Sequence, residues 1–313
     1  MTIEPMKAVL TDERFSDPDW IFERKLDGIR CLAFKADKRV SLRSRNDLSL
    51  NGRFPEIAAA LEEDPATGVV LDGEIVAFDG AQTSFARLQQ RGERPTPVFF
   101  YVFDILRAAG EDVTGEPLRA RKALLRRALG FADPIRLTAH RNGDGEAFFA
   151  EACRKGWEGV IAKRAYAPYT QGRSRDWLKF KCSAEQELVI GGYTAPRGSR
   201  TELGALLLGY YAGAALRYAG KVGTGFTRAT LRELAGKLGP LRRETSPFAD
   251  EVRERNTTWV EPQLVAQVGF SEWTRDRRLR HPRFLGLRDD KRASEVVRER
   301  NEPADRRSRG RRV

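Results

Sequence analysis

Two kinds of hydrophobic pattern divide this chain, and the change falls at about residues 182–187. Before it, short apolar runs alternate with segments whose apolar residues recur every three to four positions, which predicts mixed strands and helices. The expected strands cover 20–23, 31–34, 40–43, 69–78, 98–106, 159–163 and 177–181. The expected helices cover 54–63, 84–90, 118–129 and 146–155, and Ser84 is the expected N-cap of the second.

After the change, short strands dominate, at 187–193, 204–211, 215–222 and 259–270. One helix interrupts them at 228–238, with Thr227 as its expected cap. Several short strands around one helix are typical of an oligonucleotide-binding (OB-fold) barrel. We therefore expect a first domain over 1–184, a barrel over 185–299 and an arginine-rich tail over 300–313. The composition of the tail predicts disorder, either as a solvated end or as an arm that grips DNA.

Length and composition narrow the class of protein. The chain has 313 residues, which suits two domains, and no apolar run is long enough to span a membrane. The first residues lack the pattern of a secretory signal. The three cysteines, Cys31, Cys153 and Cys182, are widely spaced and form neither a metal pattern nor a disulfide framework. We expect three thiols, with Cys31 in the core, in a reducing, cytoplasmic setting. The sequence gives no sign of an oligomer interface, so we expect a monomer.

The charge indicates a polyanionic partner. The net charge is +12 and the pI is near 9.9. Such an excess attracts nucleic acid through a salt-sensitive term that does not depend on base sequence. The alternative is a proteome of high GC content that simply prefers arginine.

One short string carries the strongest chemical signal. Residues 23–30 read E-x-K-x-D-G-x-R, which sets Lys25 close to a carboxylate, a glycine and an arginine. This combination suits a lysine that attacks a nucleotide phosphate, because nearby cations favour the neutral amine. Lys-Asp-Gly runs also occur in surface turns, so the interpretation depends on the rest of the chain.

Later segments supply groups that such a nucleophile needs. Glu74 follows an apolar run and can accept a ribose hydroxyl, although a turn acid is the simpler reading for it alone. Phe103 lies on an aromatic strand and can stack on a base, or serve only as core. Glu158 can hold Mg²⁺ or Mn²⁺. Lys179 and Lys181 point to one face of a strand, which favours a phosphate between them.

Together these segments resemble the covalent nucleotidyltransferases, and most closely the ATP-dependent DNA ligases. The resemblance covers nearly the whole chain and rests on residues 23–30, 43–46, 72–74, 101–104, 158–163, 177–181 and 288–291. Flanking strings at 53–56, 189–193 and 279–284 are similar to the bacterial end-joining ligases, either standalone or as the ligase module of a larger repair protein. The resemblance implies an α+β nucleotidyltransferase (ATP-grasp-like) domain followed by an all-β OB-fold barrel.

It also implies a mechanism and a set of roles. Lys25 would take AMP from ATP, pass it to the 5′-phosphate at a nick, and the 3′-hydroxyl would then displace it. The catalytic residues would be Lys25, Asp27, Lys179 and Lys181. Nucleotide contacts would come from Glu23, Arg30, Arg45, Glu74, Phe103, Arg173, Lys179, Lys181, Arg288 and Lys291. Asp27 and Glu158 would support Mg²⁺ or Mn²⁺, and DNA contacts would come from Arg30, Arg45 and Arg53.

Further expectations concern motion, partners and rivals. Arg288 and Lys291 lie in the barrel, so the barrel must close for the first step, with a hinge at 182–185. The expected partner is nicked or broken duplex DNA beside the bacterial nucleoid, with possible recruitment by a Ku-type end-binding protein and no membrane. An RNA ligase or a capping-type nucleotidyltransferase is the alternative within the superfamily. A DNA-binding module without catalysis is the alternative from another class.

Overall fold

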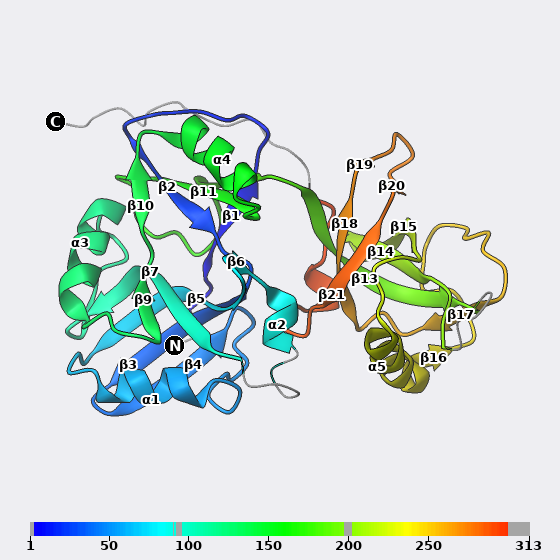
Figure 1. Cartoon of the computed structure of the whole chain (residues 1–313), viewed down its shortest axis with the longest axis horizontal. Coiled ribbons are helices and arrows are strands. Elements are labelled where there is room, and N and C mark those ends of the chain that lie inside the picture. Colours follow the sequence, from blue (N-terminus) through cyan, green and yellow to red (C-terminus); the bar gives the residue numbers. More distant parts are fainter. Residues whose placement is uncertain (1–2, 90, 92–95, 197–201, 300–313) are drawn as a thin grey trace. The chain divides into compact units, whose positions relative to one another are not determined.

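The computed structural model describes residues 3–89, 91, 96–196 and 202–299. The chain divides into two compact units, of which the first ends at Cys182 and the second is Ser183–Glu299 (Figure 1). The tail over 300–313, for which the sequence predicts disorder, lies outside the described residues.

Two sheets form the first unit. One has the strand order β1 (Met6–Leu10), β12 (Gly172–Lys181), β11 (Gly159–Arg164), β2 (Trp20–Lys25) and β10 (His140–Asn142). The other has the order β4 (Arg39–Ser44), β3 (Ile29–Ala36), β5 (Val69–Asp79), β7 (Val98–Ala108) and β8 (Glu111–Asp112), with β6 (Gln82–Thr83) beside β5 and β9 (Ile135–Leu137) beside β7. Side chains from both sheets, among them Leu32, Phe103 and Trp177, share one buried cluster, so the sheets pack face to face.

Helices cover the outer faces of both sheets. Helices α1 (Pro55–Glu63) and α3 (Leu118–Ala128) bury Leu61 and Leu125 against the second sheet. Both helices lie on the left side of Figure 1. Helix α4 (Gly145–Arg154) buries Phe148 against the first sheet. The short α2 (Phe85–Gln89) follows β6, and the Arg87 amide donates to Ser84 Oγ at 3.4 Å, which confirms the predicted cap. The predicted last residue of this helix, Gln90, lies outside the described residues.

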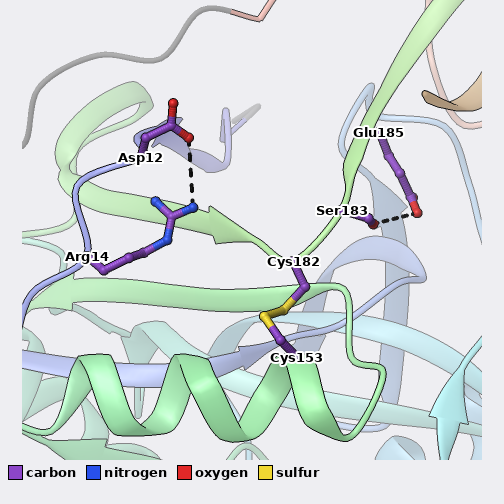
Figure 2. The surroundings of a disulfide bond; sticks show 6 residues. All are labelled: Asp12, Arg14, Cys153, Cys182, Ser183 and Glu185. Carbon is purple, nitrogen blue, oxygen red and sulfur yellow. Dashed lines mark hydrogen bonds and ion pairs between the residues drawn. A yellow bond between two sulfur atoms is a disulfide. The ribbon is translucent and has the colours of Figure 1, made fainter. Parts of the chain in front are cut away.

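A disulfide corrects the prediction of three free thiols. Cys153 in the last turn of α4 is bonded to Cys182 just beyond β12, across 29 residues of sequence (Figure 2). Helix α4 packs on β11, the strand next to β12, and this tertiary arrangement brings the two sulfurs together. Sequence spacing carries no sign of it. Cys31 is a buried free thiol, as predicted, and burial raises its pKa.

The second unit is a curled sheet of short strands with one long helix. The long strand β13 (Ala184–Thr194) pairs with β14 (Leu206–Ala212), β17 (Thr257–Val260) and β18 (Val265–Phe270). The sheet continues through β15 (Ala215–Val222), β16 (Arg242–Arg243) and β21 (Arg283–Leu287), and β19 (Glu272–Trp273) pairs with β20 (Leu279–Arg280) in a separate hairpin. Short 3₁₀ turns occur at Gly239–Leu241 and Ala293–Glu295.

Two predictions for this unit had different outcomes. Helix α5 (Arg228–Leu238) has the predicted bounds, and Thr227 Oγ1 caps it by accepting from the Thr230 amide at 3.1 Å. The single strand predicted over 259–270 is wrong, because residues 261–264 form a turn that separates β17 from β18. Pro262 in that turn cannot donate to a strand ladder. Among the described helices, none is long and apolar enough to cross a membrane.

Candidate functional site

Lys25 is the last residue of β2, on the sheet face that the second sheet covers. Its strand partner is Gly159 on β11, and Gly159 is in turn paired with Lys181 on β12. The Lys25 Nζ lies 2.5 Å from Oε1 of Glu158, the residue just before β11. The two side chains keep 18% and 13% of their surface exposed, so a ligand can reach this pair.

The glycine of the nucleophile string is needed for packing. A Cβ on Gly28 would collide with the backbone carbonyl oxygen of Ile75 on β5. The chain therefore passes from β2 into β3 against the second sheet without a side chain in the way. This close approach fixes where β2 ends, and with it the position of Lys25.

The two lysines predicted to share a face do so. Strand register pairs Ile161 with both Glu23 and Lys179, two residues along each strand from the row formed by Lys25, Gly159 and Lys181. Because side chains alternate along a strand, Glu23, Lys25, Lys179 and Lys181 all project from the same face. The sheet therefore brings Lys25, Lys179 and Lys181 to one surface, which we call the lysine face.

Glu23 lies deeper on this face, between two buried lysines. It forms ion pairs with Lys122 of α3 and, at 2.7 Å, with Lys163 of β11, and only 2% of its side chain is exposed. Burial alone would raise the pKa of the Glu23 carboxyl, but the two ammonium groups outweigh it and the pKa is lowered. Burial, together with the Lys122 charge, lowers the pKa of Lys163 to about 8 despite the attraction of Glu23. We conclude that Glu23 is ionised and firmly held.

Phe103 lies beside this clamp, enclosed by cations. The Arg30 guanidinium is 4.6 Å and the Lys163 Nζ 4.0 Å from the ring centroid, and 7% of Phe103 is exposed. Arg30 also makes a two-pronged ion pair with Asp72, at 2.5 and 2.6 Å, and this pairing raises the pKa of Arg30 against the opposing effect of burial. Arg30 on β3 is the cross-strand partner of Glu74 on β5. Glu74, the predicted ribose ligand, therefore projects from the same sheet face as Arg30.

Asp27 has a structural partner. Its Oδ2 accepts from the Phe85 amide at 3.1 Å, at the start of α2, and its own amide donates to Thr83 Oγ1. Asp27 thus ties the loop after Lys25 to the segment 83–85. Within the part of the chain that the structure describes, no group of three or more His, Cys, Asp or Glu residues forms a metal cluster. The Glu158 carboxylate faces a cation, the Lys25 ammonium, at a partly exposed position.

The three other predicted arginines of this unit lie on separate segments. Arg45 is half-buried in the turn after β4, and Arg53 packs its guanidinium over the Phe54 ring at 5.5 Å. Arg173 is exposed at the start of β12 and donates to the Ala8 carbonyl at 3.2 Å. It lies six residues before Lys179, or about 20 Å along an extended strand.

The two predicted residues of the second unit sit just past β21. Arg288 makes a two-pronged ion pair with Asp290, both contacts at 2.9 Å, and both side chains are buried. Burial would raise the pKa of Asp290, but the Arg288 guanidinium lowers it. Lys291 Nζ lies 3.4 Å from Glu187 Oε1 on β13. Asp290 therefore sets the orientation of Arg288.

The sequence did not predict the buried charged and polar groups that fix the positions of the site residues. Lys122 and Lys163 clamp Glu23, and Tyr169 donates to Asp72 at 2.7 Å. Arg121 and Asp104 form a fully buried two-pronged ion pair. The only available signal was the presence of charged residues at positions where the helix or strand pattern required burial.

Comparison with known proteins agrees with this geometry. The family model "ATP dependent DNA ligase domain" matches residues 2–181, and "ATP dependent DNA ligase C terminal region" matches 199–291. The multifunctional non-homologous end joining protein LigD of Pseudomonas aeruginosa is 40% identical over 293 residues, which cover 90% of this chain and 35% of that protein. A DNA ligase of Haloferax volcanii is 34% identical, with coverage of 87% and 50%. The chain thus spans about a third to a half of the length of these relatives.

Solved structures give the same result. A mycobacterial DNA ligase D in complex with ATP and MES matches with a TM-score of 0.69 and 37% identity, over 95% of this chain and 98% of that one. The ligase domain of Mycobacterium tuberculosis LigD matches with a TM-score of 0.51 and 38% identity, with the same coverage. The chain belongs to the ATP-dependent DNA ligases, with a nucleotidyltransferase domain followed by an OB-fold domain.

Proposed function

We propose that this chain seals breaks in duplex DNA that carry a 5′-phosphate and a 3′-hydroxyl, with ATP as the donor of AMP. The observation that carries the proposal is the lysine face, where Lys25 lies in register with Lys181 and against Glu158. Lys25 Nζ would attack the α-phosphate and expel pyrophosphate. The AMP would pass to the 5′-phosphate of the break, and attack by the 3′-hydroxyl would release it.

The other residues of this face would stabilise charge and position the nucleotide. Lys179 and Lys181 would neutralise phosphate oxygens, which is most of what phosphoryl transfer asks of a protein. Glu23 and Phe103 would bind the adenine, with Glu74 and Arg30 near the ribose or the nick. Arg45 and Arg173 would contact phosphate and Arg53 the DNA backbone. Arg288 and Lys291 would orient the pyrophosphate once the OB-fold domain has closed through the hinge at 182–185.

A divalent ion fits the donor set. Mg²⁺ and Mn²⁺ bind oxygen ligands, often one or two carboxylates together with substrate phosphates and water. Glu158 already faces the Lys25 ammonium, so its carboxylate is placed to hold a cation beside the reacting amine. Such an ion would neutralise charge on the phosphates. Asp27 would act by holding the loop after Lys25, through its bond to the Phe85 amide.

The biological setting is part of the proposal. The names of the LigD relatives associate them with non-homologous end joining, which supports a role in the repair of broken chromosomes. The substrate would then be broken or nicked duplex DNA beside the bacterial nucleoid. A Ku-type protein that binds DNA ends would be a candidate recruiter.

A nick-sealing assay tests the function. Duplexes with one nick, made with DNA or RNA strands, are incubated with the protein, a divalent metal, and ATP or GTP. We expect ATP-dependent sealing of DNA that is lost in Lys25→Ala. Sealing of RNA alone would indicate an RNA ligase, and use of GTP a capping-type enzyme. Binding of DNA without sealing under any condition would contradict the proposal.

A further inference from the structure

A cavity at the edge of the first sheet has a strongly positive lining. It lies between α3 and the strands β2 and β10, and its volume is about 210 Å³. That is less than the roughly 300–1,000 Å³ of pockets for drug-sized ligands, so it suits a small group. The cavity is lined by Ile21, Arg119, Lys122, Arg126, His140 and Asn142.

The cations come mainly from one face of α3. Arg119, Lys122 and Arg126 are spaced by three and four residues, which brings them to the same side of a helix. Two are held in place by the protein: Arg119 donates to Asn142 Oδ1 and to the Pro18 carbonyl, both at 3.1 Å, and Lys122 donates to the Phe103 carbonyl at 3.0 Å. These hydrogen bonds hold the Arg119 and Lys122 side chains in place before a ligand binds.

The positive charge is not balanced by neighbouring acids. Lys122 is paired with Glu23, but Glu23 is shared with Lys163, which leaves this buried trio with a net positive charge. Within the described residues, neither the Arg126 guanidinium nor the His140 ring makes a hydrogen bond or an ion pair. Cations gathered in a concave site raise the local concentration of anions.

His140 adds a neutral donor to the site. Burial, and then the Lys122 charge, lower its pKa to about 4, although Glu23 acts in the opposite direction. The imidazole is therefore neutral at pH 7 and carries one N–H. An anion in the cavity would favour the charged ring and could accept its hydrogen bond.

We propose that this cavity binds a phosphate group. Arginine guanidinium groups match phosphate oxygens with paired N–H donors, and Arg119 and Arg126 approach from the same helix face. The volume suits a single phosphate group. The group can belong to free phosphate or pyrophosphate, or to the backbone of DNA that lies over α3. The site adjoins the lysine face, because Lys122 in its lining also pairs with Glu23, but the proposal does not depend on the sealing reaction.

Nuclear magnetic resonance of the histidines tests this site on the full chain. The chain has two histidines, His140 and His281, so the His281→Gln variant assigns both ring signals. The His140 signal is followed during titration with inorganic phosphate, with pyrophosphate and with a short blunt duplex. We expect saturable shifts and a rise of about one unit or more in the pKa of His140, because an anion at contact distance favours the imidazolium.

Two arginine variants give a matched comparison. Arg126→Gln should weaken binding by about tenfold or more, because it removes one charged donor, whereas Arg127→Gln, also exposed but not in the lining, should not. Response to the free anions alone would assign the site to free phosphate, and a response to the duplex as well would assign it to DNA. No shift with any ligand, or equal weakening by both variants, would overturn the proposal. Lys25→Ala should bind as the native protein does, which separates this test from that of ligase activity.

Discussion

Two carboxylate–lysine contacts lie on the same sheet face but in different surroundings. Glu23 is 2% exposed and shared by Lys122 and Lys163, while Glu158 is 13% exposed and faces Lys25. Separating a buried ion pair leaves a charge that water cannot reach, which is costly. Separating a partly exposed pair costs much less. The comparison teaches that the Glu23 carboxylate stays paired with its two lysines, whereas Glu158 can exchange the Lys25 ammonium for another cation.

Loss of the buried carboxylate should have the largest effect on stability. We expect Glu23→Gln to lower the free energy of unfolding by about 3–5 kcal/mol, because two buried ammonium groups lose their counter-charge. Unfolding in urea, followed by circular dichroism, measures this change. A loss below about 1 kcal/mol, the range of exposed pairs, would remove the distinction between the two carboxylates.

Loss of the accessible carboxylate should mainly affect the chemistry. For Glu158→Gln we expect AMP transfer to the protein to slow by roughly a hundredfold, as is usual when an electrostatic contact at a reacting centre is removed. Its unfolding free energy should fall by only about 1–2 kcal/mol, between the limits for exposed and buried pairs. Rapid-quench measurement of single-turnover adenylylation gives the rate. An unchanged rate would show that Glu158 plays no part in the reaction.

The pH dependence of the unfolding free energy should distinguish the contribution of Glu23 from that of Lys163. The pKa of Glu23 is lowered on folding, so its contribution is present above about pH 4.3, the unfolded value, and is lost as the pH falls. The stability difference between the native protein and Glu23→Gln should shrink below that pH. The pKa of Lys163 falls to about 8 on folding, so its contribution to stability rises with pH from there to about 10.4. A difference that stays constant on acidification would contradict an ionised Glu23.

A third carboxylate provides the smallest expected effect. Glu151 also faces two cations, Arg141 and Lys155, but it is 20% exposed, and these partners are 41% and 54% exposed. Hydrogen bonds from Lys155 and Arg141 lower its pKa. Because solvent screens this cluster, Glu151→Gln should leave the urea midpoint unchanged within error. A shift as large as that of Glu23→Gln would mean that the number of partners, and not burial, determines the cost.

The sequence predicted elements well where local pattern and tertiary structure agree. Apolar alternation located β7, and the Thr227 cap located the start of α5. The shared face of Lys179 and Lys181 followed from strand periodicity. The prediction over 259–270 joined two strands because their apolar residues continue on both sides of the turn at Pro262.

Features that depend on distant segments were beyond the sequence. The Cys153–Cys182 disulfide and the Glu23 clamp form only when α3, α4 and the first sheet pack together. Lys163 was visible as a lysine after an apolar run, but its burial against Phe103 was not. Asp27 was assigned to a metal by resemblance, and its bond to the Phe85 amide required the fold. The periodicity of apolar residues thus predicts the apolar core but not the charged groups buried within it.

The central claim is that Lys25 carries the nucleotide, and peptide mapping tests it most directly. The protein is incubated with ATP and a divalent metal in the absence of DNA, digested without exposure to acid, and examined by mass spectrometry. We predict one AMP adduct, on the peptide that contains Lys25, which disappears in Lys25→Ala and transfers to nicked DNA added afterwards. An adduct on Lys179 or Lys181, or no adduct under conditions that support nick sealing, would contradict the account.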